Sequence, residues 1–239
     1  MNIIITGASK GIGLAIAKKF AMQSEKHSIG ICSRKSDELA KAEAELRTAN
    51  PKQEYFPKVC DVSLENDVNN FVAEFEQKFG AVDVLINNAG FGIFKSVLDL
   101  TKQEFDSTIA TNVRGVFLMT RAALPAMRAK KTGMVITISS LAGKNGFAGG
   151  AAYCASKFAV RGLMQCLFLE VRTDNIRFVT ICPGSVDTDF FIGEDHGSTL
   201  KSKKALMADD IAACVELATR LPQNADISEL EIRPTNPKG

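Results

Sequence analysis

Short β-rich runs alternate with longer helical stretches through the chain, and this alternation limits its fold more than any other feature. The strand-like runs, rich in Ile, Val, Phe and Thr, cover residues 2–6, 28–33, 54–59, 82–87, 133–139, 176–182 and 228–233. The helix-like stretches lie between them, at about residues 11–22, 36–49, 64–79, 102–128, 152–172 and 208–220. Such alternation indicates βαβ units, in which helices cover both faces of a parallel sheet. We therefore expect an α/β fold, a doubly wound Rossmann-type domain with a seven-stranded parallel sheet.

The chain shows no linker, low-complexity segment or internal repeat that would divide it. Its 239 residues and its hydrophobic content of 46% are sufficient for one large core. We expect residues 1–239 to form a single domain.

Composition excludes several classes of partner. A formal net charge of +2 gives no electrostatic footprint for nucleic acid or an anionic membrane. No apolar run approaches the roughly 20 residues of a membrane span, and the start, MNIIITGASKG, lacks the features of a signal peptide. The six cysteines show no C-x-x-C or metal-like spacing, and His27 and His196 are far apart. We expect a cytoplasmic protein without a metal site.

The segment TGASKGIG, residues 6–13, directly follows the first strand-like run and begins the first helix-like stretch. A glycine turn in this context is typical of a site for the phosphates of a dinucleotide. The N–H groups at the helix N-terminus would face those phosphates. The candidate phosphate-binding residues are Gly7, Ser9, Lys10, Gly11, Ile12 and Gly13.

The end of the second strand-like run indicates which cofactor binds. A site for NAD usually places Asp or Glu there, on the ribose 2′-hydroxyl. Here the chain reads Ser33-Arg34-Lys35, with no acid before Asp37. Arg34 can bind a 2′-phosphate through its planar guanidinium, Ser33 can donate a hydrogen bond, and Lys10 adds positive charge. We expect NADP(H); the alternative is that Arg34 and Lys10 are merely exposed.

One of the two tyrosines of the chain, Tyr153, stands four residues before Lys157 in the segment YCASK. Residues four apart on a helix lie on the same face. A phenol and an ammonium can therefore point at one spot, although many such pairs lie on the surface without a task.

These segments resemble the classical short-chain dehydrogenase/reductase family, over the chain up to about residue 190. The motifs are T-G-x-x-x-G-x-G at 6–13, Asp61-Val62, N-N-A-G at 87–90, Asn112, Ser140, Y-x-x-x-K at 153–157 and Pro183-Gly184. All stand in the family's order and at its spacing. The resemblance implies an NADP(H)-dependent oxidoreductase that transfers a hydride between nicotinamide and a carbonyl or alcohol substrate.

The resemblance also implies which residues hold the cofactor. Asp61 would accept a hydrogen bond from the adenine amino group, beside the Val62 backbone. The adenosine pocket and the central strand would be shaped by Asn87, Ala89 and Gly90. The nicotinamide end would be held by Pro183, Gly184, Val186 and Thr188. For Asp61 and Asn87, a role in an ordinary turn or cap is an equal alternative.

The same resemblance assigns catalytic roles to Asn112, Ser140, Tyr153 and Lys157. Negative charge builds on a carbonyl oxygen that receives a hydride on its carbon, so a proton donor is needed. Tyr153 would be that donor, and Lys157 would lower the tyrosine pKa and hold the nicotinamide ribose. Ser140 would orient the substrate oxygen, and Asn112 would hold a water that links Lys157 to solvent.

The resemblance weakens after Thr188, and residues 187–206 are expected to form a substrate lid. Phe190 and Phe191 in this segment suggest an apolar or aromatic substrate, although packing on the domain is equally consistent. His196 lies in the same segment, with no role assigned.

Three functions remain open. The ending ISELEIRPTNPKG and the segment YCASKFAVRGL are more similar to sepiapterin-reductase-type and other general carbonyl reductases than to 3-oxoacyl-ACP reductases. A 3-oxoacyl-ACP reductase is the second possible function. The third is an NADP-binding sensor without activity, which the presence of both Tyr153 and Lys157 disfavours.

The helix-like segment FAVRGLMQCLFLEV, residues 158–171, is apolar nearly all round. A helix buried on one side only would show a polar face. We infer a homodimer, or a homotetramer that contains it, built on the helix 153–171; burial under the protein's own loops is the alternative.

Overall fold

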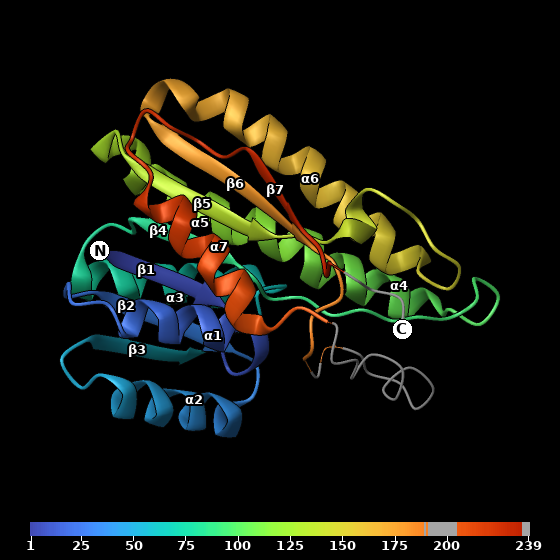
Figure 1. Cartoon of the computed structure of the whole chain (residues 1–239), viewed down its shortest axis with the longest axis horizontal. Coiled ribbons are helices and arrows are strands. Elements are labelled where there is room, and N and C mark those ends of the chain that lie inside the picture. Colours follow the sequence, from blue (N-terminus) through green and yellow to red (C-terminus); the bar gives the residue numbers. More distant parts are fainter. Residues whose placement is uncertain (189, 191–204, 236–239) are drawn as a thin grey trace.

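The computed structural model describes residues 1–188, 190 and 205–235. Within these residues, seven parallel strands form one sheet in the order β3-β2-β1-β4-β5-β6-β7. The strands are β1 Asn2–Thr6, β2 Ser28–Ser33, β3 Glu54–Val59, β4 Val84–Asn87, β5 Gly133–Ile138, β6 Ile176–Pro183 and β7 Glu229–Ile232. The expected doubly wound α/β fold is confirmed (Figure 1).

The helices follow the expected stretches, with one interruption. The α-helices are α1 Gly11–Ala21, α2 Ser36–Ala49, α3 Glu65–Phe79, α4 Lys102–Ile109, α5 Gly115–Lys130, α6 Ala151–Val171 and α7 Ala208–Arg220. A π-helix, η1 Ala110–Arg114, separates α4 from α5, so the stretch expected as one helix over 102–128 consists of three pieces. Two 3₁₀ turns are η2 Leu141–Gly143 and η3 Arg172–Asp174.

Alternating side chains of the strands supply two hydrophobic cores, one on each face of the sheet. In β1, Ile3 and Ile5 belong to one core and Ile4, between them, belongs to the other; all three are fully buried. Helices α1, α2 and α7 cover the first face, and α3, α5 and α6 cover the second (Figure 1). Burial on both faces explains why the central strands are almost continuously apolar.

The order of the strands reverses in the middle of the sheet, between β1 and β4. From β1 the chain builds outward to β3, and from β4 it builds outward to β7. Such a reversal opens a crevice at the carboxyl ends of the two central strands. The two ends are joined there by Thr6, whose Oγ1 accepts hydrogen bonds from the backbone N–H groups of Asn88 and Ala89, both at 3.0 Å.

In the described part of the chain, no helix is long and apolar enough to cross a membrane. The same residues contain no cluster of three or more His, Cys, Asp or Glu that could hold a metal ion. Each cysteine is a free thiol.

Candidate active site

A cavity of about 860 Å³ opens at the carboxyl end of the sheet. Nearly all of the sequence-predicted site residues line it, from loops that are far apart in the chain. They are Gly7, Ser9, Lys10, Gly11, Ile12, Ser33, Arg34, Asp61, Val62, Ala89, Gly90, Ser140, Tyr153, Lys157, Pro183, Gly184, Val186 and Thr188. The fold therefore brings the predicted phosphate turn and the predicted catalytic pair into one cavity.

Gly13, Asn87 and Asn112 are the predicted residues that do not line the cavity. Asn87, the last residue of β4, donates from Nδ2 to Thr120 Oγ1 on α5 at 3.1 Å. This bond ties β4 to α5. The role of Asn87 in the adenosine pocket stays a prediction. Within the described residues, the buried Oδ1 of Asn87 has no hydrogen-bond partner.

The glycine turn after β1 is shaped by close backbone packing. Gly7 has a φ of +63°, a left-handed conformation that favours glycine, and a Cβ there would lie 2.8 Å from the Ala89 Cα. A Cβ at Gly13 would lie 2.4 Å from the Gly7 carbonyl oxygen. The tight turn directs the N-terminus of α1, which carries no acidic residue in its first turn, toward the cavity.

Asn88 shapes the same turn and is not among the sequence-predicted residues. Its Nδ2 donates to the carbonyl oxygens of Thr6 at 2.9 Å and Gly7 at 3.0 Å. It also lines the cavity, whereas the neighbouring Asn87 faces α5. Strand alternation in N-N-A-G could have separated the two asparagines, because successive side chains point to opposite faces.

Cationic side chains line the cavity beyond the end of β2: Lys10, Arg34 and Lys35. The Arg34 guanidinium carbon lies 5.9 Å from the centroid of the Phe91 ring, within range of a cation–π contact. Lys35 pairs with Glu38 Oε1 at 2.9 Å, and Glu38 also lines the cavity. Sequence analysis missed Lys35 and Glu38 as site residues, although their i, i+3 spacing at the start of α2 could have suggested the pair.

Asp61 lies at the end of β3 and has a structural task of its own. Its Oδ1 accepts hydrogen bonds from the backbone N–H of Ser63 at 2.9 Å and the Ser63 hydroxyl at 2.7 Å. This is a local turn of the kind that Asp commonly forms. The contact of Asp61 with adenine stays a prediction, consistent with its place on the cavity wall.

Ser140, Tyr153 and Lys157 converge at the other end of the cavity. Ser140 follows β5, and its Oγ accepts a hydrogen bond from the Ala142 N–H at 3.1 Å, which fixes the start of η2. Tyr153 and Lys157 stand one turn apart on α6, with the ammonium nitrogen 5.7 Å from the centroid of the tyrosine ring. The Ser140 hydroxyl donates to the Pro183 carbonyl oxygen at 3.5 Å and lies close enough to the Tyr153 phenol to lower its pKa.

Burial raises the pKa of Tyr153 to about 12, an effect that the Ser140 hydroxyl partly offsets. The sequence analysis expected the opposite direction, because of the nearby ammonium. That ammonium instead donates its hydrogen bond to the Ile138 carbonyl oxygen at 2.8 Å, and desolvation of the phenolate dominates. At neutral pH Tyr153 is therefore a protonated phenol, the form that can donate a proton.

Burial also lowers the pKa of Lys157 to about 8. The side chain is only 6% exposed, so its charged form loses most of its hydration. Lys157 is thus an amine that can gain or lose a proton close to neutral pH, beside a tyrosine that can give one.

Asn112 lies in the π-helix η1, behind the cavity. Its Oδ1 accepts from the Phe91 N–H at 3.0 Å, and its Nδ2 donates to the Phe91 carbonyl at 2.8 Å and to Ser156 Oγ at 3.0 Å. The side chain therefore ties the loop after β4 to α6. A Cβ at Gly90 would lie 3.1 Å from Asn112 Oδ1 and 3.8 Å from Lys157 Nζ, so Asn112 reaches the neighbourhood of the lysine. Its expected water relay stays a prediction.

Aromatic rings flank the Tyr153 side chain. The ring centroids of Phe94 and Phe190 lie 5.4 Å and 5.6 Å from that of Tyr153, and Phe147 lies 5.8 Å from Phe94. All of these rings line the cavity. Phe94 and Phe147 were missed from the sequence, since only the fold brings their loops to the tyrosine. Phe191 and His196 lie outside the described residues.

The segment after β6 carries the predicted nicotinamide-binding residues Pro183, Gly184, Val186 and Thr188. Its base is closed by a parallel bridge between Val186 and Leu206, in which the Asp187 N–H donates to the Leu206 carbonyl at 2.8 Å. This base lies at the two ends of the expected lid, residues 187–206. Residues 189 and 191–204 of it lie outside the described part of the chain.

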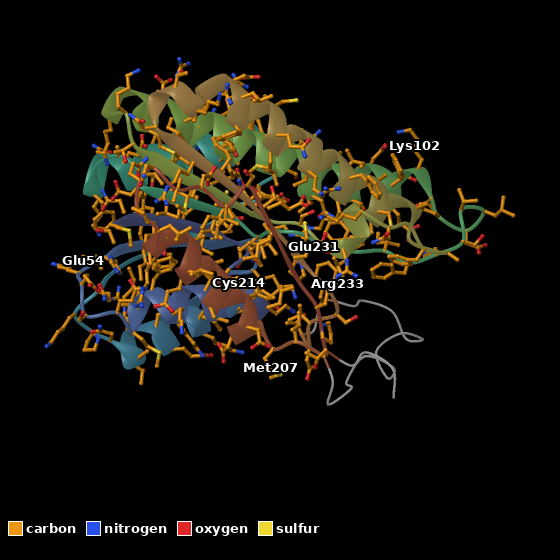
Figure 2. The ribbon with its side chains drawn as sticks, turned by 45° about the horizontal axis from the view of Figure 1, so that its top comes forward. Glu54, Lys102, Met207, Cys214, Glu231 and Arg233 are labelled. Carbon is orange, nitrogen blue, oxygen red and sulfur yellow. The ribbon has the colours of Figure 1, made fainter. Side chains whose placement is uncertain are left out.

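The end of β7 forms a wall of the cavity that the sequence analysis missed, through Arg233 and Pro234. The Gly184 N–H donates to the Ile232 carbonyl at 2.8 Å, which places the end of β7 beside the predicted nicotinamide end. Arg233 pairs with Glu231 at 2.6 Å, and Figure 2 shows both side chains together near the end of this strand. No local motif predicts this wall, because it depends on the pairing of β7 with β6.

Ion pairs and a hydrogen bond connect α6, the helix that carries Tyr153 and Lys157, to its surroundings. Arg161 on α6 donates from Nε to Glu229 Oε2 of β7 and from Nη1 to the Gly143 carbonyl of η2, both at 2.7 Å. Lys144 adds pairs to Glu229 and Glu231. This Arg161 brace links the element that carries Tyr153 to the turn that follows Ser140.

Known proteins resemble this chain in sequence and in architecture. The family of short chain dehydrogenases matches residues 1–197. The chain is 34% identical to a sepiapterin reductase of Chlorobaculum tepidum, over 98% of this chain and 96% of that protein. The structure of an alcohol dehydrogenase from the archaeon Thermococcus sibiricus, complexed with 5-hydroxy-NADP, matches with a TM-score of 0.88 at 32% identity and covers 98% of this chain and 96% of the other. A metagenomic short-chain oxidoreductase in complex with NADP matches with a TM-score of 0.85 at 35% identity, over 99% and 97% of the two chains.

Proposed function

Because the chain belongs to the short-chain dehydrogenase family, we propose that it is an NADP(H)-dependent carbonyl reductase of sepiapterin-reductase-like type. It is an oxidoreductase that acts on CH–OH and C=O groups. We further propose that the carbonyl of its substrate is attached to an aromatic or apolar group.

One observation carries this proposal: Ser140, Tyr153 and Lys157 meet at one end of the cavity whose other end is the glycine turn and the cations Lys10 and Arg34. A nucleotide bound on the turn would extend from an anion site to a proton donor. A protein that only binds the nucleotide would need the glycine turn and the cations, but not Ser140, Tyr153 and Lys157 together.

The residues present fit NADP(H). Gly7 and Gly11 both have positive φ and line the cavity, so the turn presents backbone without side chains at these positions beside the N-terminus of α1, where a pyrophosphate would bind. Lys10 and Arg34 would bind the 2′-phosphate, and Lys157 would hold the nicotinamide ribose. The solved relatives described above, which carry NADP or 5-hydroxy-NADP, support the same cofactor. When bound, the nicotinamide supplies or accepts the hydride.

The protein's own groups manage the proton and the substrate oxygen. As the carbonyl carbon is reduced, its oxygen gains negative charge and accepts the phenolic proton of Tyr153. Ser140 lies within hydrogen-bonding reach of the same phenol, so its hydroxyl can donate to the same substrate oxygen and orient it. Lys157 then stabilises the tyrosinate that forms, which lowers the barrier relative to an isolated phenol.

The walls around Tyr153 favour a flat, apolar substrate. Phe94, Phe147 and Phe190 enclose the approach to the phenol, and aromatic pairs gain about 0.5–1.5 kcal/mol beyond simple burial. Asn145 and Ser185 also line the cavity and can hydrogen-bond a polar edge of such a ring. A pterin with a side-chain carbonyl combines both properties.

A panel of carbonyl compounds with NADPH tests this function. We expect turnover of sepiapterin, aryl ketones and aryl diketones, and little turnover of acetoacetyl-ACP. Turnover of acetoacetyl-ACP alone would favour a 3-oxoacyl-ACP reductase, and tight NADPH binding without any turnover would favour a sensor.

We also propose that the protein acts in the cytoplasm as a homodimer or homotetramer. Free thiols throughout the described residues suit a reducing compartment. On the outer face of α6, Phe158 is 45% and Leu169 is 63% exposed, and the space next to Gly162 is open. Together these residues form an apolar surface (the α6 face) that a second copy can cover.

A further inference from the structure

A carboxylate occupies the end of the cavity where the 2′-phosphate of the cofactor is expected. Glu38, in the first turn of α2, accepts a hydrogen bond from Ser9 Oγ at 3.4 Å and from Lys35 Nζ at 2.9 Å. Ser9 belongs to the glycine turn, and all three residues line the cavity. Glu38 thus binds Ser9, which the sequence predicts to hold a cofactor phosphate.

The Glu38 side chain is an ionised carboxylate at neutral pH. The Lys35 hydrogen bond, and to a lesser degree the charge of Lys10, holds its pKa below the usual range of a glutamate. Lys35, one of the three cations at this end of the cavity, is therefore already paired with an internal anion. Arg34 points elsewhere, toward the Phe91 ring.

We infer that Glu38 acts as an internal anion that competes with the 2′-phosphate and so limits the preference of the enzyme for NADPH over NADH. The inference rests on the proposed function and adds a specificity-determining residue to it. The 2′-phosphate is expected on Lys10 and Arg34, and Lys10 directly follows Ser9, to which the Glu38 carboxylate is hydrogen-bonded. The phosphate then lies beside a like charge.

The same carboxylate favours the other cofactor. A ribose 2′-hydroxyl is a hydrogen-bond donor, and an acidic residue at this end of the site is the usual partner of that hydroxyl in NAD enzymes. In this chain the residue that directly follows β2 is a cation, and the acid comes from the first turn of α2 instead. Glu38 therefore weakens NADPH binding and supports NADH binding.

The substitution Glu38→Gln tests the inference, because it removes the charge and keeps the shape. Asp37→Asn is the matched control: it removes one charge from the same helical turn, but Asp37 is exposed and does not line the cavity. Dissociation constants of NADPH and NADH are measured for the wild type and both variants by calorimetry. Adenosine 2′,5′-bisphosphate and adenosine 5′-monophosphate, which differ only by the 2′-phosphate, are measured in parallel.

We expect Glu38→Gln to bind NADPH and the bisphosphate about tenfold more tightly, which corresponds to about 1.4 kcal/mol. Binding of NADH should stay equal or weaken, and Asp37→Asn should change each constant by less than about twofold. An unchanged ratio of NADPH to NADH affinity in Glu38→Gln overturns the inference, and so does an equal shift in Asp37→Asn. Wild-type protein that binds neither cofactor overturns the proposed function, and the inference with it.

Discussion

Tyr153 and Lys157 are both buried ionisable side chains, and burial shifts their pKa values in opposite directions, to about 12 and about 8. Each shift favours the neutral form. The tyrosine is consequently a reliable proton donor at neutral pH, and the lysine titrates close to the pH at which enzymes work. Two neighbouring ionisable groups whose pKa values are strongly shifted by their environment are typical of acid–base sites.

Removal of the phenolic hydroxyl is the sharpest test of the donor. Tyr153→Phe keeps the ring contacts with Phe94 and Phe190. We expect kcat to fall by at least about 100-fold, the scale of a lost general acid, because the variant has no phenolic proton to donate to the substrate oxygen. Steady-state kinetics measure the loss, and NADPH titration should show unchanged cofactor affinity. A variant with near wild-type turnover would exclude Tyr153 as the acid.

Burial of Lys157 should also cost stability. The difference between its ordinary pKa of 10.5 and the value of about 8 corresponds to about 3 kcal/mol of penalty at neutral pH. Lys157→Met removes this penalty and one hydrogen bond to Ile138, worth about 1 kcal/mol, so we expect a stability gain of about 2 kcal/mol at pH 7. Urea unfolding measures it.

The pH dependence of that gain follows from proton binding. Between the folded pKa of about 8 and the unfolded value of 10.5, the unfolded wild type holds more protons than the folded one. Its free energy of unfolding therefore rises with pH in this window, and the advantage of Lys157→Met should shrink from pH 8 upward. A gain that is equal at pH 7 and pH 10 would contradict the buried-amine interpretation.

At the scale of the elements, the sequence predicted the sheet and the positions of nearly all helices, because period and composition decide these locally. The π-helix η1 was not predictable in this way. It contains Asn112, whose side chain hydrogen-bonds Phe91 and Ser156. Both partners are distant from Asn112 in the sequence. Glu38, Phe94 and Arg233 were missed as site residues for the same reason: their roles depend on which loops the fold brings together.

The Arg161 brace joins several elements, so its removal should lower the stability of the fold. Arg161→Met removes the bonds to Glu229 and Gly143 that join α6, β7 and η2. The pair is about three-quarters buried, with exposures of 21% and 26%, so we expect a loss of about 1–2 kcal/mol, discounted for solvent screening. Thermal unfolding should show a decrease of about 2–8 °C.

A matched control separates this effect from simple loss of charge. Arg47→Met breaks an exposed i, i+4 pair with Glu43 on α2, remote from the catalytic helix. It should change the melting temperature by less than about 2 °C and leave kcat unchanged. Equal effects of the two substitutions would show that the Arg161 brace does not position α6.

For the whole molecule, the unpartnered α6 face predicts assembly. Light scattering should count two or four subunits in the wild type at micromolar concentration. Leu169→Glu places a charge on the α6 face and should yield monomers, since burying an unpaired carboxylate is unfavourable. Leu98→Glu is the control, because Leu98 is 93% exposed and belongs to the loop before α4 rather than to α6. A wild-type monomer, or dissociation by Leu98→Glu alone, would contradict the proposed interface.

The wall that β7 adds to the cavity has a consequence for biosynthesis. Gly7 leaves the ribosome more than 200 residues before Arg233, yet both line the same cavity. At typical elongation rates the two are made on the order of tens of seconds apart. During that interval the nascent chain carries a glycine turn and a central strand but no complete nucleotide site. Cofactor binding can therefore stabilise the finished protein, while the growing one must rely on its own core or on chaperones.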